Sequence, residues 1–369
     1  MTDNYIFYAA PLSYYSAKVR PYLKWKQIPH VEELSSAKIY QSVILPRVGW
    51  PVIPIVVTPE DQTWQDTTEI IDHFEDRFPT PSVYPEGPRQ KFVALLMELY
   101  GDEGLKVAAM HYRWNYNEEW VTLEFGKTSA PDETEEQQRA IGAERLKPFK
   151  GFVPLLGVNE ATIPAIEASY EGFLRDLGAH FKHHPYLLGT RPSIGDYGLV
   201  GPLYAHLYRD PASGEVMERV SPEMVAWTKR THFPETPGEG SFLPNDEVPE
   251  TLYPVLARQF REQMPMLYET VAGYAAWCEA SDDREVPRAL GKQKLVFDGL
   301  EDNPAAVCMM QSFPLWMLQR VYDHYHSLSG VDRAAVDTLL DAIGGQSFRD
   351  LKIIKRVKRE NFKLVRADA

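Results

Sequence analysis

The first 80 residues alternate strand and helix patterns, and this alternation limits the possible folds of the chain more than any other feature. Tyr5–Ala9 is a short apolar run typical of a strand, and a helix follows it toward Lys26. Ile53–Val57 is an apolar run in which β-branched residues dominate, as in a buried strand. Asp66–Phe78 places its apolar side chains on one face of a helix. This pattern predicts an α/β domain in which helices cover a sheet.

A change of composition after this region indicates a domain boundary. Residues 81–88 are rich in proline and form the predicted linker. Beyond it the segments are typical of helices. We therefore predict an all-helical second domain over residues 89–369, with an insertion near residues 120–160 and an extension beyond residue 230.

The composition argues against several partners and sites. The formal net charge of −13 would repel the phosphates of nucleic acid. The chain has no run of about eighteen apolar residues, and its start lacks the basic and apolar regions of a signal peptide. The two cysteines, Cys278 and Cys308, share no metal-binding motif. We expect a cytoplasmic protein with no membrane span, no disulfide and no metal.

The only concentrated basic stretch is the tail, Lys352–Arg366. It mixes its charges with apolar residues such as Val357, Phe362 and Leu364. We interpret the tail as the solvated face of an element that packs on the body of the protein, in preference to a surface for anionic partners.

Three segments carry more specific information. Pro11–Arg20 follows the first predicted strand, Val52–Ile55 places a proline at the start of a strand, and Gln65–Ile70 places an acid and a hydroxyl at the start of a helix. In order and approximate spacing they resemble the glutathione S-transferase superfamily in its serine-type form. The resemblance implies a thioredoxin-like domain over residues 1–80. It also implies that the capping box at Ser193–Asp196 begins the central helix of the second domain.

The resemblance implies that glutathione is a co-substrate and that Ser13 contacts its sulfur, because serine-type members place a hydroxyl six residues before the position of Val19. A hydroxyl at a helix N-terminus can donate a hydrogen bond to a thiolate, which is the nucleophilic form. Tyr14 or Tyr15 could supply that hydroxyl instead, as could Tyr8 at the end of the first strand. Alternatively, Ser13 only caps the helix.

The other two segments imply the rest of a glutathione site. Ile53 and Pro54 match a cis-proline step, which turns the neighbouring backbone toward the cysteinyl part of glutathione. Asp66 and Thr67 match the acid and hydroxyl pair that holds the γ-glutamyl group, although the family's pair is more often Glu-Ser. The hydroxyl and the helix amides can bind the γ-glutamyl carboxylate, while the acid faces the amine. Arg47 is the candidate cation for the glycine carboxylate.

Two further segments carry histidines. His111 and Asp102 could act as acid and base, but the aromatic residues around His111 are more typical of a core or a pocket wall, with Arg113 in an ion pair. His324 and His326 are two residues apart, which is a poor spacing for a metal. We therefore predict that their helix belongs to the core.

Together these features favour a glutathione transferase. The thiolate of bound glutathione would attack an electrophilic carbon of a small apolar substrate, and the reaction would be a conjugation, a dehalogenation or an ether cleavage. Members of the family commonly have their glutathione sites near a two-fold interface, and this predicts a homodimer. The long extension instead favours a non-catalytic binding or assembly protein with the same fold. Retention on glutathione resin and turnover of an aromatic electrophile would separate the two classes.

Overall fold

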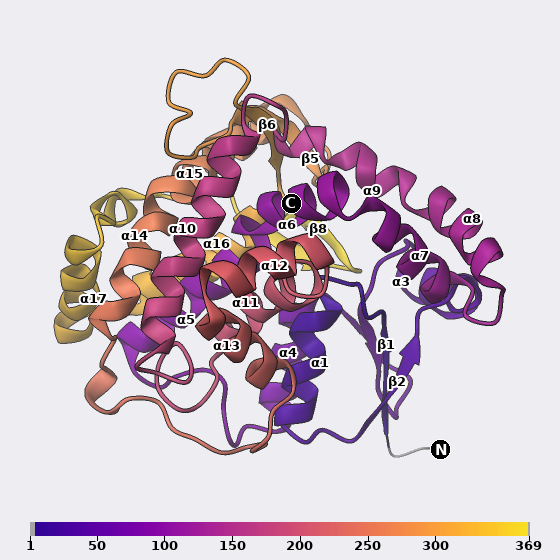
Figure 1. The fold of residues 1–369 in the computed structure, drawn as a ribbon. Helices are drawn as coiled ribbons and strands as arrows, with labels where there is room; N and C mark the ends of the chain where they lie inside the picture. Colours follow the sequence, from indigo (N-terminus) through magenta and orange to yellow (C-terminus); the bar gives the residue numbers. More distant parts are fainter. Residues whose placement is uncertain (1–3, 368–369) are drawn as a thin grey trace.

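A four-stranded sheet with the strand order β2-β1-β3-β4 forms the centre of the N-terminal domain. The structure is a computed structural model and describes residues 4–367 (Figure 1). β1 (Tyr5–Ala9) runs parallel to β2 (His30–Leu34) and antiparallel to β3 (Ile55–Val57). β3 also pairs with the antiparallel strand β4 (Thr63–Gln65). The predicted α/β pattern is confirmed, because each predicted strand forms.

Helices cover both faces of this sheet, in a thioredoxin-like arrangement. They are α1 (Ser16–Trp25), α2 (Ala37–Ile39), the π-helical turn η1 (Tyr40–Ile44), α3 (Leu45–Val48) and α4 (Thr67–Arg77). Phe7 and Val56 point into the large core shared with α1 and α4. Tyr8 and Ile55 point into a smaller cluster with η1 and α3. Neighbouring strand residues point to opposite faces of a sheet, so the apolar runs supply both layers at once.

Helices packed around α11 make up most of the second domain. Before the extension they are α5 (Pro88–Leu99), the π-helical turn η2 (Tyr100–Gly104), α6 (Lys106–Tyr116), α7 (Glu118–Ser129), α8 (Glu135–Arg145), α9 (Lys147–Phe152), α10 (Ile163–Phe181), α11 (Ile194–Ala205), α12 (Pro211–Val220) and α13 (Pro222–His232). The predicted capping box is confirmed. The Ser193 N–H donates to the Asp196 carboxylate at 2.8 Å, and the Asp196 N–H donates to Ser193 Oγ at 3.4 Å. Every residue from Ile194 to Leu203 is buried, as expected of a central helix.

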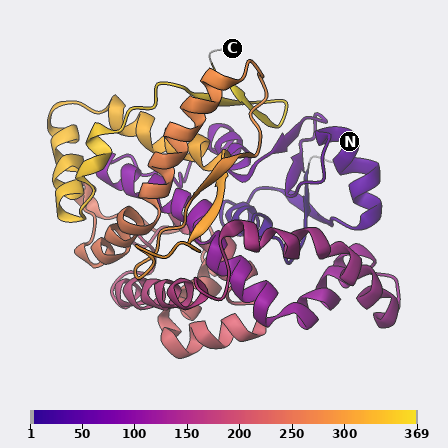
Figure 2. The same ribbon diagram turned by 90° about the horizontal axis from the view of Figure 1, so that it is seen from above.

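The segment predicted to be an insertion forms a tight hairpin of α7 and α8. A Cβ atom on Gly126 would lie 1.9 Å from the carbonyl oxygen of Gln138, and one on Gly142 would lie 1.9 Å from that of Thr122. Glycine at these two positions therefore allows the helices to approach closely. Figures 1 and 2 both place this hairpin on the side of the molecule where the N-terminal domain lies.

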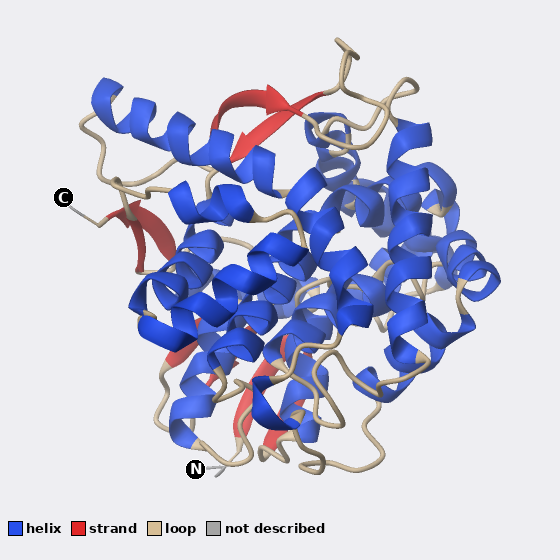
Figure 3. Ribbon diagram, turned by 90° about the vertical axis from the view of Figure 1, so that its left-hand side faces the viewer, coloured by secondary structure: helices blue, strands red, loops and turns tan. Residues whose placement is uncertain are grey.

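The extension contains two short β-hairpins, so the prediction of an all-helical second domain is wrong at these places. Its elements are α14 (Tyr253–Glu262), α15 (Met264–Ala280), β5 (Ala289–Lys294), β6 (Val307–Gln311), α16 (Phe313–Ser327), α17 (Gly330–Ala342), β7 (Val357–Glu360) and β8 (Lys363–Arg366). β5 pairs with β6 and β7 with β8 (Figure 3). The turn of the second hairpin holds Asn361 and Phe362 at φ angles of 47° and 63°, as in a two-residue hairpin turn. The tail packs on the body by burying Leu364 and Val365.

The last helices pack on α5 of the second domain and on α4 of the N-terminal domain. Phe92 of α5 contacts the rings of Tyr325 and Phe348, with centroid separations of 6.1 and 5.6 Å. Arg320 of α16 forms an ion pair with Asp72 of α4 at 2.6 Å. α16 thus contributes to the core, as predicted, and also lies against α4.

Both cysteines lie in the interior of the described part of the chain. Cys278 and Cys308 are free thiols and are buried. Residues 4–367 contain no cluster of three or more histidine, cysteine, aspartate or glutamate side chains placed to hold a metal ion. None of the described helices is both long enough and apolar enough to cross a membrane.

Candidate functional site

The strand register brings the three predicted segments to one edge of the sheet. Tyr8 of β1 pairs with Ile55 of β3, and Ile55 pairs on its other side with the residue before Asp66. Paired residues lie in one row across a sheet. The row therefore leads directly to the loop that carries Ser13, to Pro54, and to the start of α4.

Ser13 caps the first helix. Its N–H donates to the carbonyl of Ala10 at 3.1 Å, and its Oγ accepts from the N–H of Ser16 at 3.1 Å. The capping role is therefore present in the structure. A hydroxyl that accepts one hydrogen bond keeps its own hydrogen to donate, and the Ser13 side chain is half-exposed. Capping and contact with a ligand sulfur are thus compatible.

Arg113 fixes the loop that leads to Ser13. This guanidinium donates to both carboxylate oxygens of Asp210, at 2.6 and 2.8 Å, which confirms the predicted ion pair. It also donates to the carbonyl of Leu12 at 3.0 Å and to that of Ala205 at 2.6 Å. A buried arginine of the second domain thus holds the backbone of Leu12, the residue directly before Ser13, in position. A planar guanidinium with five N–H donors suits this task.

The three tyrosines considered for the thiol differ in what their hydroxyls can do. Tyr14 donates to the carbonyl of Gly101 at 2.5 Å, so its one hydroxyl hydrogen is already used. Tyr8 points into the cluster beside α3, on the sheet face opposite α1. Tyr15 is half-buried, and burial and the nearby Glu103 raise its pKa well above 10. Tyr15 is therefore a protonated donor and is the main alternative to Ser13.

The Ile53–Pro54 peptide bond is cis, as predicted. The ladder between β1 and β3 begins only at Ile55. The backbone of Ile53 therefore stands outside this ladder, where its N–H and carbonyl can pair with an extended peptide such as the cysteinyl part of glutathione.

Asp66 and Thr67 open α4. The Asp66 carboxylate accepts from the N–H of Thr68 at 2.9 Å, and Asp66 has φ +79° and ψ 137°. A non-glycine residue in this region of the backbone map is unfavourable by about 1–3 kcal/mol, so its surroundings must hold it there. Thr67 is buried at the first helical position. The first amides of α4 can bind a carboxylate, because a helix N-terminus carries unpaired N–H groups and a positive partial charge.

Arg47 does not belong to this edge of the sheet. Its guanidinium donates to Asp61 and, at 3.1 Å, to Oγ1 of Thr63. Asp61 lies in the turn between β3 and β4, and Thr63 is the first residue of β4, so both are at the opposite end of the strands from Pro54 and Asp66. The Asp61 carboxylate fixes Arg47 there, so its predicted contact with the glycine carboxylate of glutathione is not supported.

A buried ion cluster behind α4 was missed by the sequence analysis. The Lys18 ammonium donates to Glu98 at 2.7 Å, to Asp102 at 2.5 Å and to Oγ1 of Thr68 at 3.0 Å. Its side chain is 0% exposed. Burial lowers the pKa of Lys18, but Asp102 and Glu98 raise it further, so the lysine stays charged. The available signal was its spacing: Lys18 lies four residues before Tyr22, on the buried face of α1.

The same cluster perturbs Asp102. Burial raises the pKa of its carboxyl group to about 8, although Lys18 opposes the shift. Its second oxygen, Oδ1, is buried with no hydrogen-bond partner among the described residues. Two buried carboxylates around one cation leave excess negative charge, and a proton on Asp102 removes that excess.

We therefore expect Asp102→Asn to flatten the pH dependence of stability. An Asp that ionises near pH 3.9 when unfolded and near 8 when folded contributes stability that is complete below pH 3.9 and is lost as the pH rises toward 8. The loss reaches about 1.4 kcal/mol per pH unit for one proton. Asparagine mimics the protonated acid but does not ionise, so the variant lacks this pH-dependent contribution to the free energy of unfolding. Urea unfolding at pH 5, 6, 7 and 8 measures the difference.

Asp302→Asn, at an exposed position, is the matched control and should follow the wild type at every pH. If the stability difference between Asp102→Asn and the wild type is constant from pH 5 to 8, Asp102 is ionised throughout and the interpretation of the cluster is wrong.

His111 does not pair with Asp102. Asn115 donates to its Nδ1 at 2.7 Å, and its Nε2 donates to Glu167 at 2.9 Å. The ring is buried, and burial lowers its pKa. Tyr112 beside it is in the core, as predicted. His111 is therefore a neutral structural residue.

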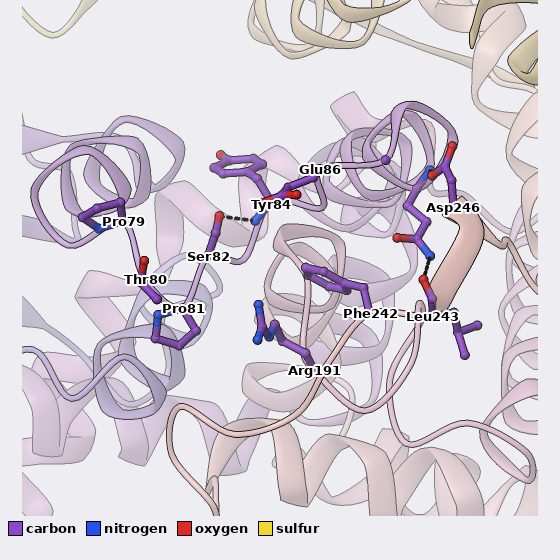
Figure 4. Close-up of a pocket in the computed structure, with 12 residues that line it drawn as sticks. Pro79, Thr80, Pro81, Ser82, Tyr84, Glu86, Arg191, Phe242, Leu243 and Asp246 are labelled. Carbon is purple, nitrogen blue, oxygen red and sulfur yellow. Dashed lines mark hydrogen bonds between the residues drawn. The ribbon is translucent and has the colours of Figure 1, made fainter. Parts of the chain in front are cut away.

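A surface cavity of about 350 Å³ lies away from the sheet edge, beside the linker between the domains (Figure 4). Seven residues between Pro79 and Gly87 form one wall, and Arg191 and Phe242 lie across from it. The lining includes none of the residues predicted to bind glutathione.

Comparison with known proteins agrees with the sheet-edge geometry. Residues 7–82 match the family model of the glutathione S-transferase N-terminal domain. The N-terminal domain is similar to that of glutathione S-transferases. The match covers the three segments that converge at the sheet edge and ends inside the linker. No curated protein sequence matches the chain.

Solved glutathione S-transferases align with about two thirds of the chain at low identity. One from Rhodospirillum rubrum F11 is 16% identical, with a TM-score of 0.42, over 67% of this chain and 96% of its own. One from Methylobacterium radiotolerans, in complex with glutathione sulfonate, is 18% identical, with a TM-score of 0.40, over 67% and 100%. One from Ceriporiopsis subvermispora, in complex with glutathione, is 14% identical, with a TM-score of 0.42, over 63% and 99%.

Proposed function

We propose that the chain binds glutathione at the edge of the N-terminal sheet and transfers its thiolate to an electrophilic carbon of a small apolar substrate. The observation that carries this proposal is the strand register. It places the loop of Ser13, the cis-proline step at Pro54 and the N-terminus of α4 at one edge, within the segment that matches the transferase N-terminal domain.

Each part of glutathione has a partner at this edge. The first amides of α4, with Thr67, would bind the γ-glutamyl carboxylate, and Asp66 would face the γ-glutamyl amine. The backbone of Ile53 would pair with the cysteinyl unit. The Ser13 hydroxyl would donate to the sulfur at the N-terminus of α1, where the helix dipole also favours negative charge.

The chemistry needs no further cofactor. The bound thiol releases its proton to solvent, because the hydroxyl and the helix dipole stabilise the thiolate. The sulfur then forms a bond to the electrophilic carbon, and the leaving group departs with the electron pair of the bond that breaks. Ser13 remains a hydrogen-bond donor throughout.

Glutathione should bind to the wild type at millimolar or lower concentration, and Asp66→Ala should weaken binding about ten- to a hundredfold. Losing a hydrogen bond to a charged group is worth roughly 1.5–3 kcal/mol, and the variant also loses the cap on the Thr68 N–H. Isothermal titration calorimetry measures both dissociation constants.

Asp61→Ala is the matched control. Asp61 also has a positive φ angle, 65°, but lies in the turn at the far end of β3 and β4. Its removal should leave the glutathione affinity unchanged. Absence of glutathione binding by the wild type would overturn the proposed function. Binding without turnover of an aromatic electrophile would instead favour the non-catalytic member of the fold, as the long extension suggests.

A further inference from the structure

The C-terminal hairpin reaches the corner of the N-terminal domain where α4 begins. Arg359 of β7 donates through Nε to Glu69 at 2.8 Å, and through Nη2 to the side-chain oxygen of Gln65 at 2.6 Å and to its carbonyl at 3.3 Å. The two partners lie on either side of Asp66–Thr68. One guanidinium from the extension thus bridges the whole segment proposed to hold the γ-glutamyl group.

We propose that Arg359 is a positioning residue of the glutathione site and that the extension, through it, makes γ-glutamyl recognition depend on the end of the chain. This inference rests on the proposed function. It assigns a role in ligand binding to a residue far outside the segment that matches the transferase N-terminal domain.

The backbone of Asp66–Thr68 needs a contact that holds it in place. Asp66 adopts φ +79°, a conformation that persists only where the surrounding structure enforces it. Glu69 lies in the first turn of α4, where its negative charge would oppose an incoming carboxylate. Burial raises the pKa of Glu69, and Arg359 counteracts that shift by pairing with the ionised form. Arg359 therefore both fixes the loop backbone and offsets a charge that would repel the ligand.

Arg359 is itself held in place. Its side chain is 5% exposed, and its guanidinium lies 5.7 Å from the ring centroids of both Phe313 and Trp316. Val357, two residues earlier, exchanges two hydrogen bonds of 2.8 and 2.9 Å with the side chain of Gln319. The arginine is thus built into a rigid surface of α16 and β7.

Neighbouring contacts continue along the same helix. Arg320 of α16 pairs with Asp72 of α4 at 2.6 Å, and Met317 contacts the Thr68 hydroxyl through its sulfur at 3.7 Å. The extension therefore packs against the first half of α4, from Thr68 to Asp72. Phe362, at the hairpin turn, packs on the small cluster that also includes Ile53.

Two ligands separate a local role from a general loss of structure. Glutathione and the dipeptide Cys-Gly share the thiol and the glycine carboxylate, but only glutathione carries the γ-glutamyl group. In calorimetry, Arg359→Gln should weaken glutathione binding about tenfold and Cys-Gly binding less than twofold. Arg359→Lys should restore part of the loss, since it keeps the charge but not the two-sided contact.

Arg284→Gln is the matched control. Arg284 pairs at 2.6 Å with Glu360, which lies on the same hairpin as Arg359, and the Arg284 side chain is 50% exposed. It should bind both ligands like the wild type. Equal affinity of Arg359→Gln and wild type for glutathione, or equal loss for both ligands, would overturn the inference.

Amide hydrogen exchange of the free protein tests the positioning without a ligand. Arg359→Gln should speed exchange at residues 65–69 relative to wild type and to Arg284→Gln. Unchanged exchange there would overturn the inference whatever the binding data show. A wild type that shows no glutathione binding, together with faster exchange in Arg359→Gln, would refute the proposed function and the ligand role of Arg359 while confirming the contact.

Discussion

Lys18→Met is expected to lower the free energy of unfolding by about 3–5 kcal/mol, because removing one partner of a buried ion pair leaves uncompensated charge in the interior. The lysine is fully buried and contacts Glu98 at 2.7 Å and Asp102 at 2.5 Å. Methionine has a similar length and fills most of the same space, so the loss reports mainly on the charge. Urea denaturation at pH 7 measures it.

The destabilisation by Lys18→Met should shrink as the pH is lowered, because protons then neutralise the carboxylate that the variant leaves without a cation. Lys24→Met is the matched control on the same helix. Lys24 is exposed, and its replacement should change stability by no more than about 0.5 kcal/mol. A change of that size in Lys18→Met as well would contradict the role of the cluster.

Replacing all three ionisable groups separates the effect of charge from the effect of packing. The triple variant Lys18→Met, Glu98→Gln, Asp102→Asn should recover much of the lost stability, since no unpaired charge remains. The cluster joins α1, α4 and α5, and the Thr68 hydroxyl donates to Glu98 at 2.9 Å. It therefore ties the predicted thiol and γ-glutamyl elements of the N-terminal domain to the second domain.

Most of the N-terminal domain could be predicted from the sequence, because its signals are local. The strand over Ile55–Val57 is an uninterrupted β-branched run. The capping box at Ser193–Asp196, which lies in the second domain, likewise needs only four residues. The cis bond before Pro54 followed from the resemblance. Such features depend on neighbouring residues, so a single sequence contains the necessary information.

The features that were missed depend on residues distant in the sequence. Lys18 and Glu98 are separated by 80 positions, and Arg359 and Glu69 by 290. Nothing near Lys18 in the sequence shows which acids will surround it. Arg47 was predicted to contact the glycine carboxylate only because it lies in the corresponding segment of the sequence. In the structure its pairing with Asp61 holds it elsewhere. The four-residue strands of the second hairpin are too short to produce a clear pattern, and docking on the body stabilises them.

Ser13→Ala is expected to lower turnover near neutral pH by roughly ten- to a hundredfold while leaving glutathione affinity nearly intact. A hydrogen bond to a charged group is worth about 1.5–3 kcal/mol, and one pKa unit corresponds to about 1.36 kcal/mol. The hydroxyl could therefore lower the pKa of the bound thiol by about one to two units. Raising the pH should recover much of the lost rate, because the solvent then deprotonates the thiol. Steady-state rates with an aromatic electrophile from pH 6 to 9 measure this.

The structure supplies the control for Ser13→Ala, because Ser13 Oγ also accepts from the Ser16 N–H at 3.1 Å. Losing that cap costs about 1 kcal/mol of stability without altering the pH profile. Ser16→Ala removes a comparable acceptor, the one for the Ala10 N–H at 3.4 Å, on a side chain that is fully buried. It should lower stability but preserve turnover. If Ser13→Ala keeps wild-type turnover from pH 6 to 9 and Tyr15→Phe abolishes turnover, Tyr15 activates the thiol and Ser13 only caps the helix.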